Sequence, residues 1–396
     1  MELIKNTNID FLGKQKVGLI LSGALIIIGV VSLILHAGPN FGIDFRGGVK
    51  VFAKFNRAVT EGELSTMLGQ LGYDRAKVRV DRAREEAFID LPYNETFTEQ
   101  RVNARLASDP GDATAMSVSV SSATEKIHVF QQGDAVVLID GEQRLRNEIA
   151  DVVESGDVIT FRLAEEIGAD LTDAAEIQVQ ASVGRILADA LLQGRDDWRA
   201  LQGAVSVNEV GPSVGKDLKW AALWSALWAI VIMLLYIRVR FESFHFATGA
   251  IVALVHDVLI TLGVFSVLAT EINLPTVAAF LTIIGYSLND TIVVFDRIRE
   301  NTTVLKGLSL REIINKSINQ SLSRTIITSL TTLIVVIAIF VLTSPGEEIN
   351  TFAFALIVGV IVGTYSSVFI ASPILDALHQ RALRRERVRQ QQPSTA

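Results

Sequence analysis

Six apolar stretches are the feature that most constrains the fold of this chain. Each is close to or longer than the roughly 20 residues that an α-helix needs to cross a bilayer. Charged residues are rare within them, and the segments between them are biased toward one sign of charge. The sequence therefore predicts an α-helical membrane protein with six transmembrane helices, at residues 17–35, 220–237, 243–268, 272–295, 325–343 and 351–375.

The first stretch has a second interpretation, a secretory signal peptide, because Lys14 and Lys16 precede it. It is longer than the roughly 7–15 residues of a signal-peptide core, and no A-x-A cleavage site follows it. A buried helix of a large soluble protein is the alternative for any single stretch. Six of them in one chain favour membrane spans, with residues 1–16 as an N-terminal tail.

Composition agrees with a membrane protein and excludes several classes of function. Of the 396 residues, 49% are hydrophobic and only 20% are charged, and the mean hydropathy is +0.38. A formal net charge of −7 gives no support to nucleic-acid binding, which needs a basic surface. Because the chain contains no cysteine, it has no disulfide, no Cys-ligated metal and no thiol nucleophile.

The basic residues predict the topology. Lysine and arginine gather in the N-terminal tail, at Arg238 and Arg240, throughout 296–324 and in the tail at 376–396. The other two short loops contain no lysine or arginine, and their charged residues are Glu271, Glu347 and Glu348. The positive-inside rule then places both termini in the cytoplasm and residues 36–218 outside. We interpret the basic C-terminal tail as fixing topology; contact with anionic lipid or ribosomal RNA is the alternative.

Residues 36–218 predict an α+β domain. Alternation in VKVFAKF (49–55) is typical of a strand, and TEGELSTMLGQLG (60–72) opens with a capping-box pattern. Strands at 76–81 and 87–91, a helix within 174–194 and a strand at 204–210 complete a ferredoxin-like order. An insertion at about 94–173 contains three further strand patterns, at 126–131, 135–139 and 157–163. They either form a separate lobe or extend the same sheet.

Glycines mark both attachments of this domain to the spans. Gly47 and Gly48 precede its first strand, and Gly211, Pro212 and Gly215 follow its last one. Glycine permits positive φ and proline fixes φ, so both places suit sharp bends. They are hinges by one interpretation and tight turns by the other.

Charged side chains inside the spans are the candidate functional residues, because each costs about 3 kcal/mol at mid-bilayer on insertion scales. Asp257 lies beside His256 near the middle of the third span, and Asp290 lies beside Asn289 near the cytoplasmic end of the fourth. Arg324 opens the fifth span at a depth similar to that of Asp290. Asp296 is at the membrane boundary, where we expect it to be solvated.

Asp290 has two interpretations. It is a proton or ion acceptor whose affinity depends on its surroundings, or it forms a static salt bridge with Arg324 that locks two helices together. His256 and Asp257 are also candidates for ion coupling, although adjacent residues of a helix point in different directions. For Asn289 we expect a hydrogen bond to a neighbouring helix rather than an ion.

Other residues of the spans predict packing. Gly359 and Gly363 form a GxxxG motif, and Gly285 also permits close helix approach. Trp220 suits the aromatic belt at the membrane surface, while Trp224 and Trp228 are expected to pack against a helix or lipid.

No motif for ATP binding or hydrolysis is present, so we expect a protein that is not an enzyme and has no cofactor. His36 and His128 show no metal-ligand spacing. The transmembrane potential supplies about 2.3 kcal/mol per charge per 100 mV, which is enough for a few ions to drive a conformational change.

Five motifs resemble the SecF family of the bacterial SecDF protein-export complex: FGIDFRGG (41–48), NEVGPSVG (208–215), ALVHDVLITLG (253–263), IGYSLNDTIVVFDRIREN (284–301) and SRTIITSLTTL (323–333). The resemblance implies half of a resistance–nodulation–division type bundle, with SecD as the other half. The segment 94–173 is longer than is usual in the family.

The resemblance also implies a function. Members of the family use the flow of protons, or in some bacteria sodium, to help the SecYEG channel and the SecA motor move preproteins across the cytoplasmic membrane. By motif match, Asp290 and Arg324 correspond to the family's functional aspartate and arginine. A further key aspartate belongs to SecD and is not in this chain.

We therefore expect protonation of Asp290 to weaken its attraction to Arg324 and to shift the helices, with the shift reaching the outer domain through Gly47–Gly48 and residues 211–215. An exporter of small molecules or lipids is the first alternative, and an aromatic-lined pocket in the outer domain would favour it. A scaffold that does not transport is the second, and an enzyme with an outer active site is the last.

Overall fold

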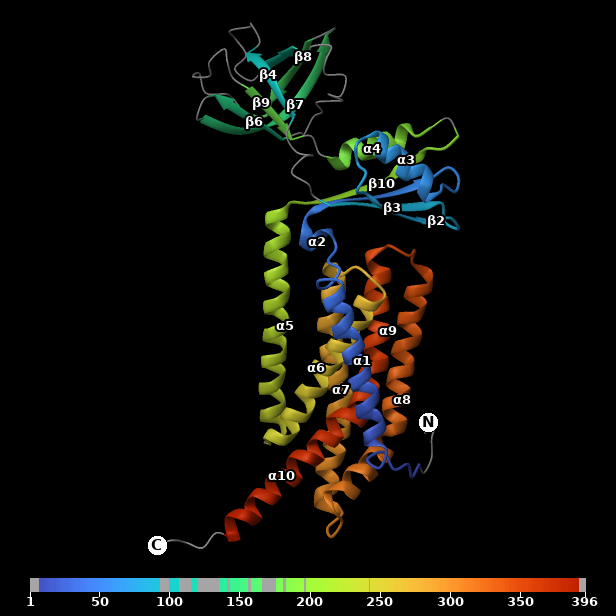
Figure 1. Ribbon diagram of the computed structural model, residues 1–396, viewed down its shortest axis with the longest axis vertical. Helices are drawn as coiled ribbons and strands as arrows, with labels where there is room; N and C mark the ends of the chain where they lie inside the picture. The colour runs from blue at the N-terminus through green and yellow to red at the C-terminus, as the bar shows by residue number, and fades with distance from the viewer. Residues whose placement is uncertain are drawn as a thin grey trace. The chain divides into compact units, whose positions relative to one another are not determined.

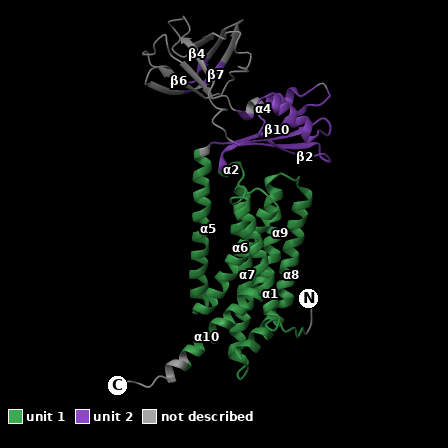
Figure 2. Cartoon of the chain, viewed as in Figure 1, with its two compact units in different colours: residues 1–45, 213–396 green, residues 46–212 purple. Residues whose placement is uncertain are grey.

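The computed structural model describes most of the chain as two compact units, residues 1–45 with 213–396 and residues 46–212 (Figure 2). The described residues are 7–92, 100–106, 115–119, 135–140, 143–155, 158–165, 176–180, 183–195, 197–241 and 243–391.

The first unit is a bundle of long helices (Figure 1). Among the described residues, six helices are long and apolar enough to cross a membrane, which confirms the predicted multi-pass membrane protein. Their bounds are α1 Gln15–Leu35, α5 Pro212–Phe241, α6 Phe244–Val267, α7 Leu274–Val304, α8 Leu310–Leu342 and α9 Glu348–Ser366. Several of them extend beyond the apolar run that predicted them, because backbone hydrogen bonding continues after hydrophobicity ends.

The last predicted span, 351–375, lies within one continuous run of helix, Glu348–Arg385, that contains a π-helical turn. After α9 the chain makes a π-helical turn, η3 Ser367–Ala371, and continues as α10 Ser372–Gln391. The Ser372 hydroxyl donates to the carbonyl of Ser367 at 2.9 Å, within the widened turn. Figure 1 shows α10 leaving the bundle at an angle to α9, so the basic tail begins as a helix that diverges from the spans.

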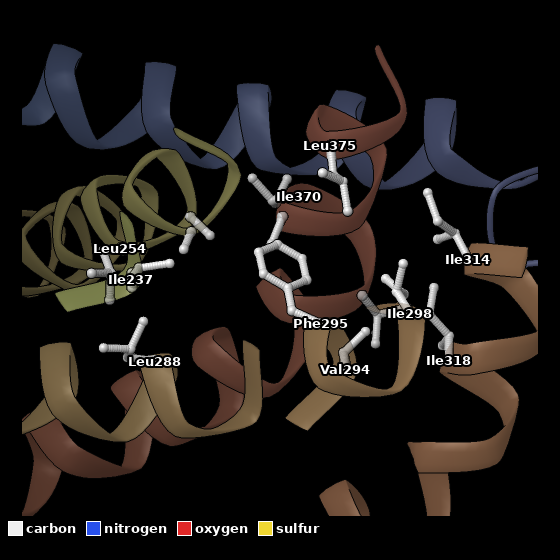
Figure 3. Packing of buried hydrophobic residues seen from close by; sticks show 14 of the residues in the cluster. Ile237, Leu254, Leu288, Val294, Phe295, Ile298, Ile314, Ile318, Ile370 and Leu375 are labelled. Carbon is white, nitrogen blue, oxygen red and sulfur yellow. The ribbon is translucent and has the colours of Figure 1, made fainter. Parts of the chain in front are cut away.

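The bundle has a hydrophobic core and an apolar exterior. Phe295 is fully buried and makes edge contacts with Phe241 and Phe246 at centroid distances of 6.0 and 5.1 Å. Branched aliphatic side chains from α5 to α10 surround it (Figure 3). By contrast, Ile20 of α1 is 72% exposed. Such outward apolar side chains are typical of helices that face lipid or another membrane subunit.

The tryptophans of α5 belong to that exterior, since Trp220, Trp224 and Trp228 are all more than half exposed. Among the described residues the deeper two are therefore largely uncovered, as side chains that contact lipid or another subunit would be.

Close helix packing occurs where the GxxxG motif predicts it. A β-carbon added to Gly359 of α9 would lie 2.2 Å from Ile283 of α7, and one on Gly363 would lie 3.0 Å from Ser287. Nothing lies within 4 Å of the same position on Gly285, which is exposed. The GxxxG prediction is confirmed, and the packing role expected for Gly285 is wrong within the described residues.

The second unit contains a four-stranded sheet in the order β10-β1-β3-β2. Its strands are β1 Gly48–Phe55, β2 Lys77–Asp81, β3 Glu86–Pro92 and β10 Ala200–Val210, with α3 Glu61–Gln70 and α4 Val183–Gln193 as its helices. This order confirms the ferredoxin-like fold. The predicted capping box is present, with Glu63 N–H donating to the Thr60 hydroxyl at 3.2 Å and Thr60 N–H donating to the Glu63 carboxylate at 2.7 Å.

The strands described within the insertion form a closed barrel of their own, in the order β4-β5-β8-β7-β6-β9. Their bounds are β4 Gln100–Leu106, β5 Ala115–Ser119, β6 Ala135–Asp140, β7 Gln143–Ser155, β8 Val158–Leu163 and β9 Glu176–Gln180. The strands predicted at 135–139 and 157–163 are β6 and β8, whereas the one predicted at 126–131 lies outside the described residues. The helix predicted within 174–194 is α4, Val183–Gln193, and Glu176–Gln180 before it pairs with β4 and β6.

The two attachments differ. Gly47 and Gly48 have φ of 78° and 149°, the region that favours glycine, which explains their place before β1. At the other attachment β10 ends at Val210 and α5 begins at Pro212, so residues 212–215 form the first turn of α5. Proline suits that position because the first helical N–H has no intrahelical partner.

Candidate ion-coupling site in the helix bundle

Two carboxylates lie in the interior of the bundle. Asp257 of α6 is fully buried and Asp290 of α7 is 2% exposed. Both helices contact α9, and α7 also contacts α8. Serine hydroxyls of neighbouring helices lie within hydrogen-bond distance of both carboxylates.

Three side chains lie within hydrogen-bond distance of the Asp257 carboxylate. The Ser287 and Ser366 hydroxyls donate to its Oδ2 at 2.5 and 2.8 Å, and His256 Nδ1 lies 2.8 Å from its Oδ1. These donors come from α6, α7 and α9, so one carboxylate connects three helices. A buried carboxylate of this kind is tolerated because its oxygens are satisfied.

Asp290 lies one helical turn after Ser287 on α7 and faces different partners. The Ser329 hydroxyl of α8 donates to its Oδ2 at 3.3 Å, and Ser329 lies 2.7 Å from the Thr364 hydroxyl of α9. Asp290 therefore meets α8 and α9 through hydroxyls. A change in its charge would act directly on that three-helix contact.

The salt bridge expected between Asp290 and Arg324 is not formed: among the ion pairs of the described residues, none joins them. Arg324 is exposed, whereas Ser329, five residues later on α8, points inward to Asp290. At 3.6 residues per turn, five residues turn the helix by about 140°. The face of α8 that carries Ser329 therefore lies against Asp290, and a different face carries Arg324.

Asn289 and Asp296 lie outside this interior cluster. Asn289 is exposed, and among the described residues its side chain forms no hydrogen bond, so the expected contact with a neighbouring helix is not made within this chain. Asp296 pairs with Arg240 at 3.0 Å at the end of the bundle, and both side chains are partly exposed, in agreement with a solvated boundary position.

The hydroxyl partners Ser287, Ser329, Thr364 and Ser366 are not among the residues that the sequence predicts. A weak signal is present, because Ser287 precedes Asp290 by three residues and Ser329 follows Arg324 in an apolar span rich in serine and threonine. Such residues are common in membrane helices, so composition alone does not identify these four.

The described residues contain no group of three or more His, Cys, Asp or Glu side chains placed to hold a metal ion. His36 is bonded to Ser32 at the end of α1, and His128 lies outside the described residues.

Comparison with known proteins identifies the family. The model of the C-terminal part of the protein export membrane proteins SecD and SecF matches residues 197–381, and that of the SecD/SecF GG motif matches residues 32–55. The protein translocase subunit SecF of Koribacter versatilis is 36% identical over 96% of this chain and 94% of its own length. That of Thermodesulfovibrio yellowstonii is also 36% identical, over 97% and 99%.

The chain belongs to the SecF family.

The fold agrees. The crystal structure of SecDF from Thermus thermophilus, described as a translocon-associated membrane protein, superposes with a TM-score of 0.61 at 26% identity over 96% of this chain. This chain spans 40% of the SecDF chain. The two SecF-related segments contain Gly47 and Gly48 on one side and Asp257, Asp290 and Arg324 on the other. The interior carboxylates therefore lie in the part of the SecF fold that the family model describes.

Proposed function

We propose that this chain, together with SecD, uses the proton or sodium motive force to assist export of preproteins by the SecYEG channel and the SecA motor. It works as a multi-pass protein of the cytoplasmic (inner) membrane, with both termini in the cytoplasm and residues 36–218 outside. It has no hydrolytic site of its own. The observation that carries the proposal is Asp290, a carboxylate buried where three helices of an export-subunit fold meet.

Burial of Asp290 in the helix bundle costs free energy, and this cost indicates that the residue has a function. An ionisable group inside a membrane bundle marks an ion pathway by default, because a charge kept there without a function would be replaced by an apolar residue at a gain in stability. The transmembrane potential supplies about 2.3 kcal/mol per charge per 100 mV, which is comparable to the free-energy cost of placing one charge at mid-bilayer on insertion scales. Ion passage can thus drive a change in helix packing.

The first step is protonation of Asp290. A neutral carboxyl both donates and accepts hydrogen bonds, so the hydrogen bond between Asp290 and Ser329 is rearranged. This rearrangement relaxes the contact among α7, α8 and α9. Arg324, on the exposed face of α8, is the cation that a partner subunit or an altered packing brings toward the site. Movement of the bundle reaches the second unit through the two chain connections, at residues 45–48 and 210–213.

Asp290→Asn tests the proposal, with Asp296→Asn at the solvated end of the same helix as the control. We expect Asp290→Asn to abolish the export that depends on the motive force while its amount in the membrane and its association with SecD stay normal. Asp296→Asn should retain export. Full export by Asp290→Asn would refute the coupling role.

Purification from the native membrane tests the proposed partners separately. SecD and SecYEG should accompany the chain in mild detergent. Purification of the chain without either of them would argue against an export role, whatever the Asp290 variant does.

A further inference from the structure

His256 has one buried ring nitrogen with no hydrogen-bond partner. The side chain is only 5% exposed, its Nδ1 lies 2.8 Å from Asp257 Oδ1, and its Nε2 is buried without a partner among the described residues. Buried polar atoms are normally satisfied, and a lasting exception calls for a physical explanation.

The hydrogen bonds of Asp257 indicate which ring nitrogen of His256 can gain a proton. Two hydroxyls donate to Asp257 Oδ2, and Oδ1 of the ionised carboxylate accepts from His256 Nδ1–H, because an ionised carboxylate has no proton to donate. A neutral imidazole that donates through Nδ1 carries its lone pair on Nε2. Nε2 is then the basic atom of the pair, and Asp257 is positioned to balance the charge that a proton there would create.

Few titratable groups face this pair. The ring of Tyr365 on α9 stacks beside His256 at a centroid distance of 6.4 Å, and its hydroxyl donates to the Gly18 carbonyl of α1 at 2.5 Å. The other interior carboxylate, Asp290 of α7, is hydrogen-bonded to Ser329 of α8 rather than to this pair.

On α1 and α10, which also pack against α6, three ionisable groups have contacts away from this pair. His36 at the end of α1 is bonded to Ser32, Asp376 of α10 pairs with Arg311, and the ring of His379 contacts that of His245. Among the described residues, no lysine or arginine pairs with Asp257. A proton on Nε2 would therefore make His256 the cationic partner of this carboxylate among the ion pairs of the described residues.

We propose that His256 Nε2 is a second proton-binding atom of the bundle, with Asp257 as its counter-ion. The proton comes from water admitted when the helices part; the N–H bond forms at Nε2, Nδ1–H stays on Asp257, and the reverse step returns the proton to water. Ser287, which bonds Asp257, and Asp290 are one turn apart on α7, so movement of that helix acts on both sites. This inference deepens the proposed function, on which only its coupling part rests.

Nuclear magnetic resonance of the full chain with SecD in lipid tests proton binding without any transport. Histidine is labelled with 15N, and the signal that disappears in His256→Asn is assigned to His256. Asparagine keeps a donor near the Nδ1 position and has no basic atom. The signals are followed as the pH is lowered from about 8 to about 5, the range in which histidine side chains commonly bind a proton; the proposal requires the Nε2 signal to move to its protonated position while Nδ1 stays protonated. A signal unchanged over that range, or an Nε2 that is always the protonated nitrogen, would overturn the proposal.

Export measured with the same variants tests coupling. His256→Asn should lose export to the level of Asp290→Asn while keeping the thermal stability of the wild type, and His245→Asn, half-buried at the start of α6, should retain export. If His256→Asn unfolds, His256→Gln provides the second neutral variant. Normal export by a folded His256 variant would refute coupling at this site. Normal export by Asp290→Asn would instead refute the proposed function, so the two failures are distinguishable.

Discussion

Gly29 of α1 and Gly263 of α6 lie backbone to backbone. A β-carbon on Gly29 would be 2.7 Å from the Cα of Gly263, and one on Gly263 would be 2.9 Å from the Cα of Gly29. One turn further along both helices, the hydroxyls of Ser32 and Ser266 are 2.8 Å apart. Small residues allow this approach, and the hydroxyl pair then fixes the crossing point of the two helices.

The glycine contact predicts a sharp difference between two alanine substitutions in α1. Gly29→Ala should destabilise the bundle by about 1–3 kcal/mol, because the atom it meets is backbone and cannot rotate away. Gly23→Ala meets nothing within 4 Å, so it should leave stability unchanged or raise it by up to about 1 kcal/mol through helix propensity. Unfolding in detergent measures both, and equal stabilities would contradict the contact.

Removal of the hydroxyl that serves Asp290 should weaken export without abolishing it. Ser329→Ala deletes the donor to Asp290 and the contact with Thr364, at a cost of about 1–3 kcal/mol in bundle stability. The carboxylate itself remains, so we expect export between that of the wild type and that of Asp290→Asn. Thr332→Ala is the matched control, because the Thr332 hydroxyl bonds only to the Thr328 carbonyl of its own helix. Equal export by the two variants would argue against a role for Ser329.

The second unit contains a carboxylate that should make its stability depend on acid. Arg57 donates to Glu63 Oε1 at 2.8 Å, and this hydrogen bond, followed by those from Thr60, lowers the pKa of Glu63 to about 2. Because the pKa is lower in the folded than in the unfolded chain, where it is about 4.3, folding favours the ionised form. The stabilisation is fully present above about pH 4.3 and is lost as the pH falls toward 2.

Thermal unfolding between pH 2 and 5 measures this effect. Glu63→Gln should show a smaller fall in melting temperature across that window than the wild type. Glu61→Gln, in the exposed first turn of α3, should keep the wild-type dependence. A Glu63→Gln profile parallel to that of the wild type would show that Glu63 does not cause the fall in melting temperature at low pH.

The segment before α1 should be held by two asparagines of α8. Asn319 accepts from the N–H of Ile9 and donates to its carbonyl, both at 2.9 Å, and Asn315 accepts from the N–H of Phe11 at 2.8 Å. Asn319→Ala should therefore increase amide hydrogen exchange at residues 9–12. Lys316→Ala, on the same helix, should not, and unchanged exchange in Asn319→Ala would show that this clamp contributes nothing.

The apolar runs alone determined the number and approximate position of the spans, because roughly 20 apolar residues in succession have few other stable environments. Charge in such a run likewise singled out Asp257 and Asp290. The order of strands and helices in 48–92 and 183–210 determined the ferredoxin-like sheet, and Gly47 and Gly48 marked the positive-φ entry to it.

Tertiary structure decided which groups the carboxylates meet. Whether Asp290 faces Arg324 or Ser329 depends on how α8 is rotated, and that rotation follows from packing along the whole helix. The π-helical turn at Ser367–Ala371 and the closure of the barrel depend equally on contacts between segments distant in sequence. Hydrophobicity is a property of each residue and can be read locally, whereas hydrogen-bond partners are set only when several helices share one interior.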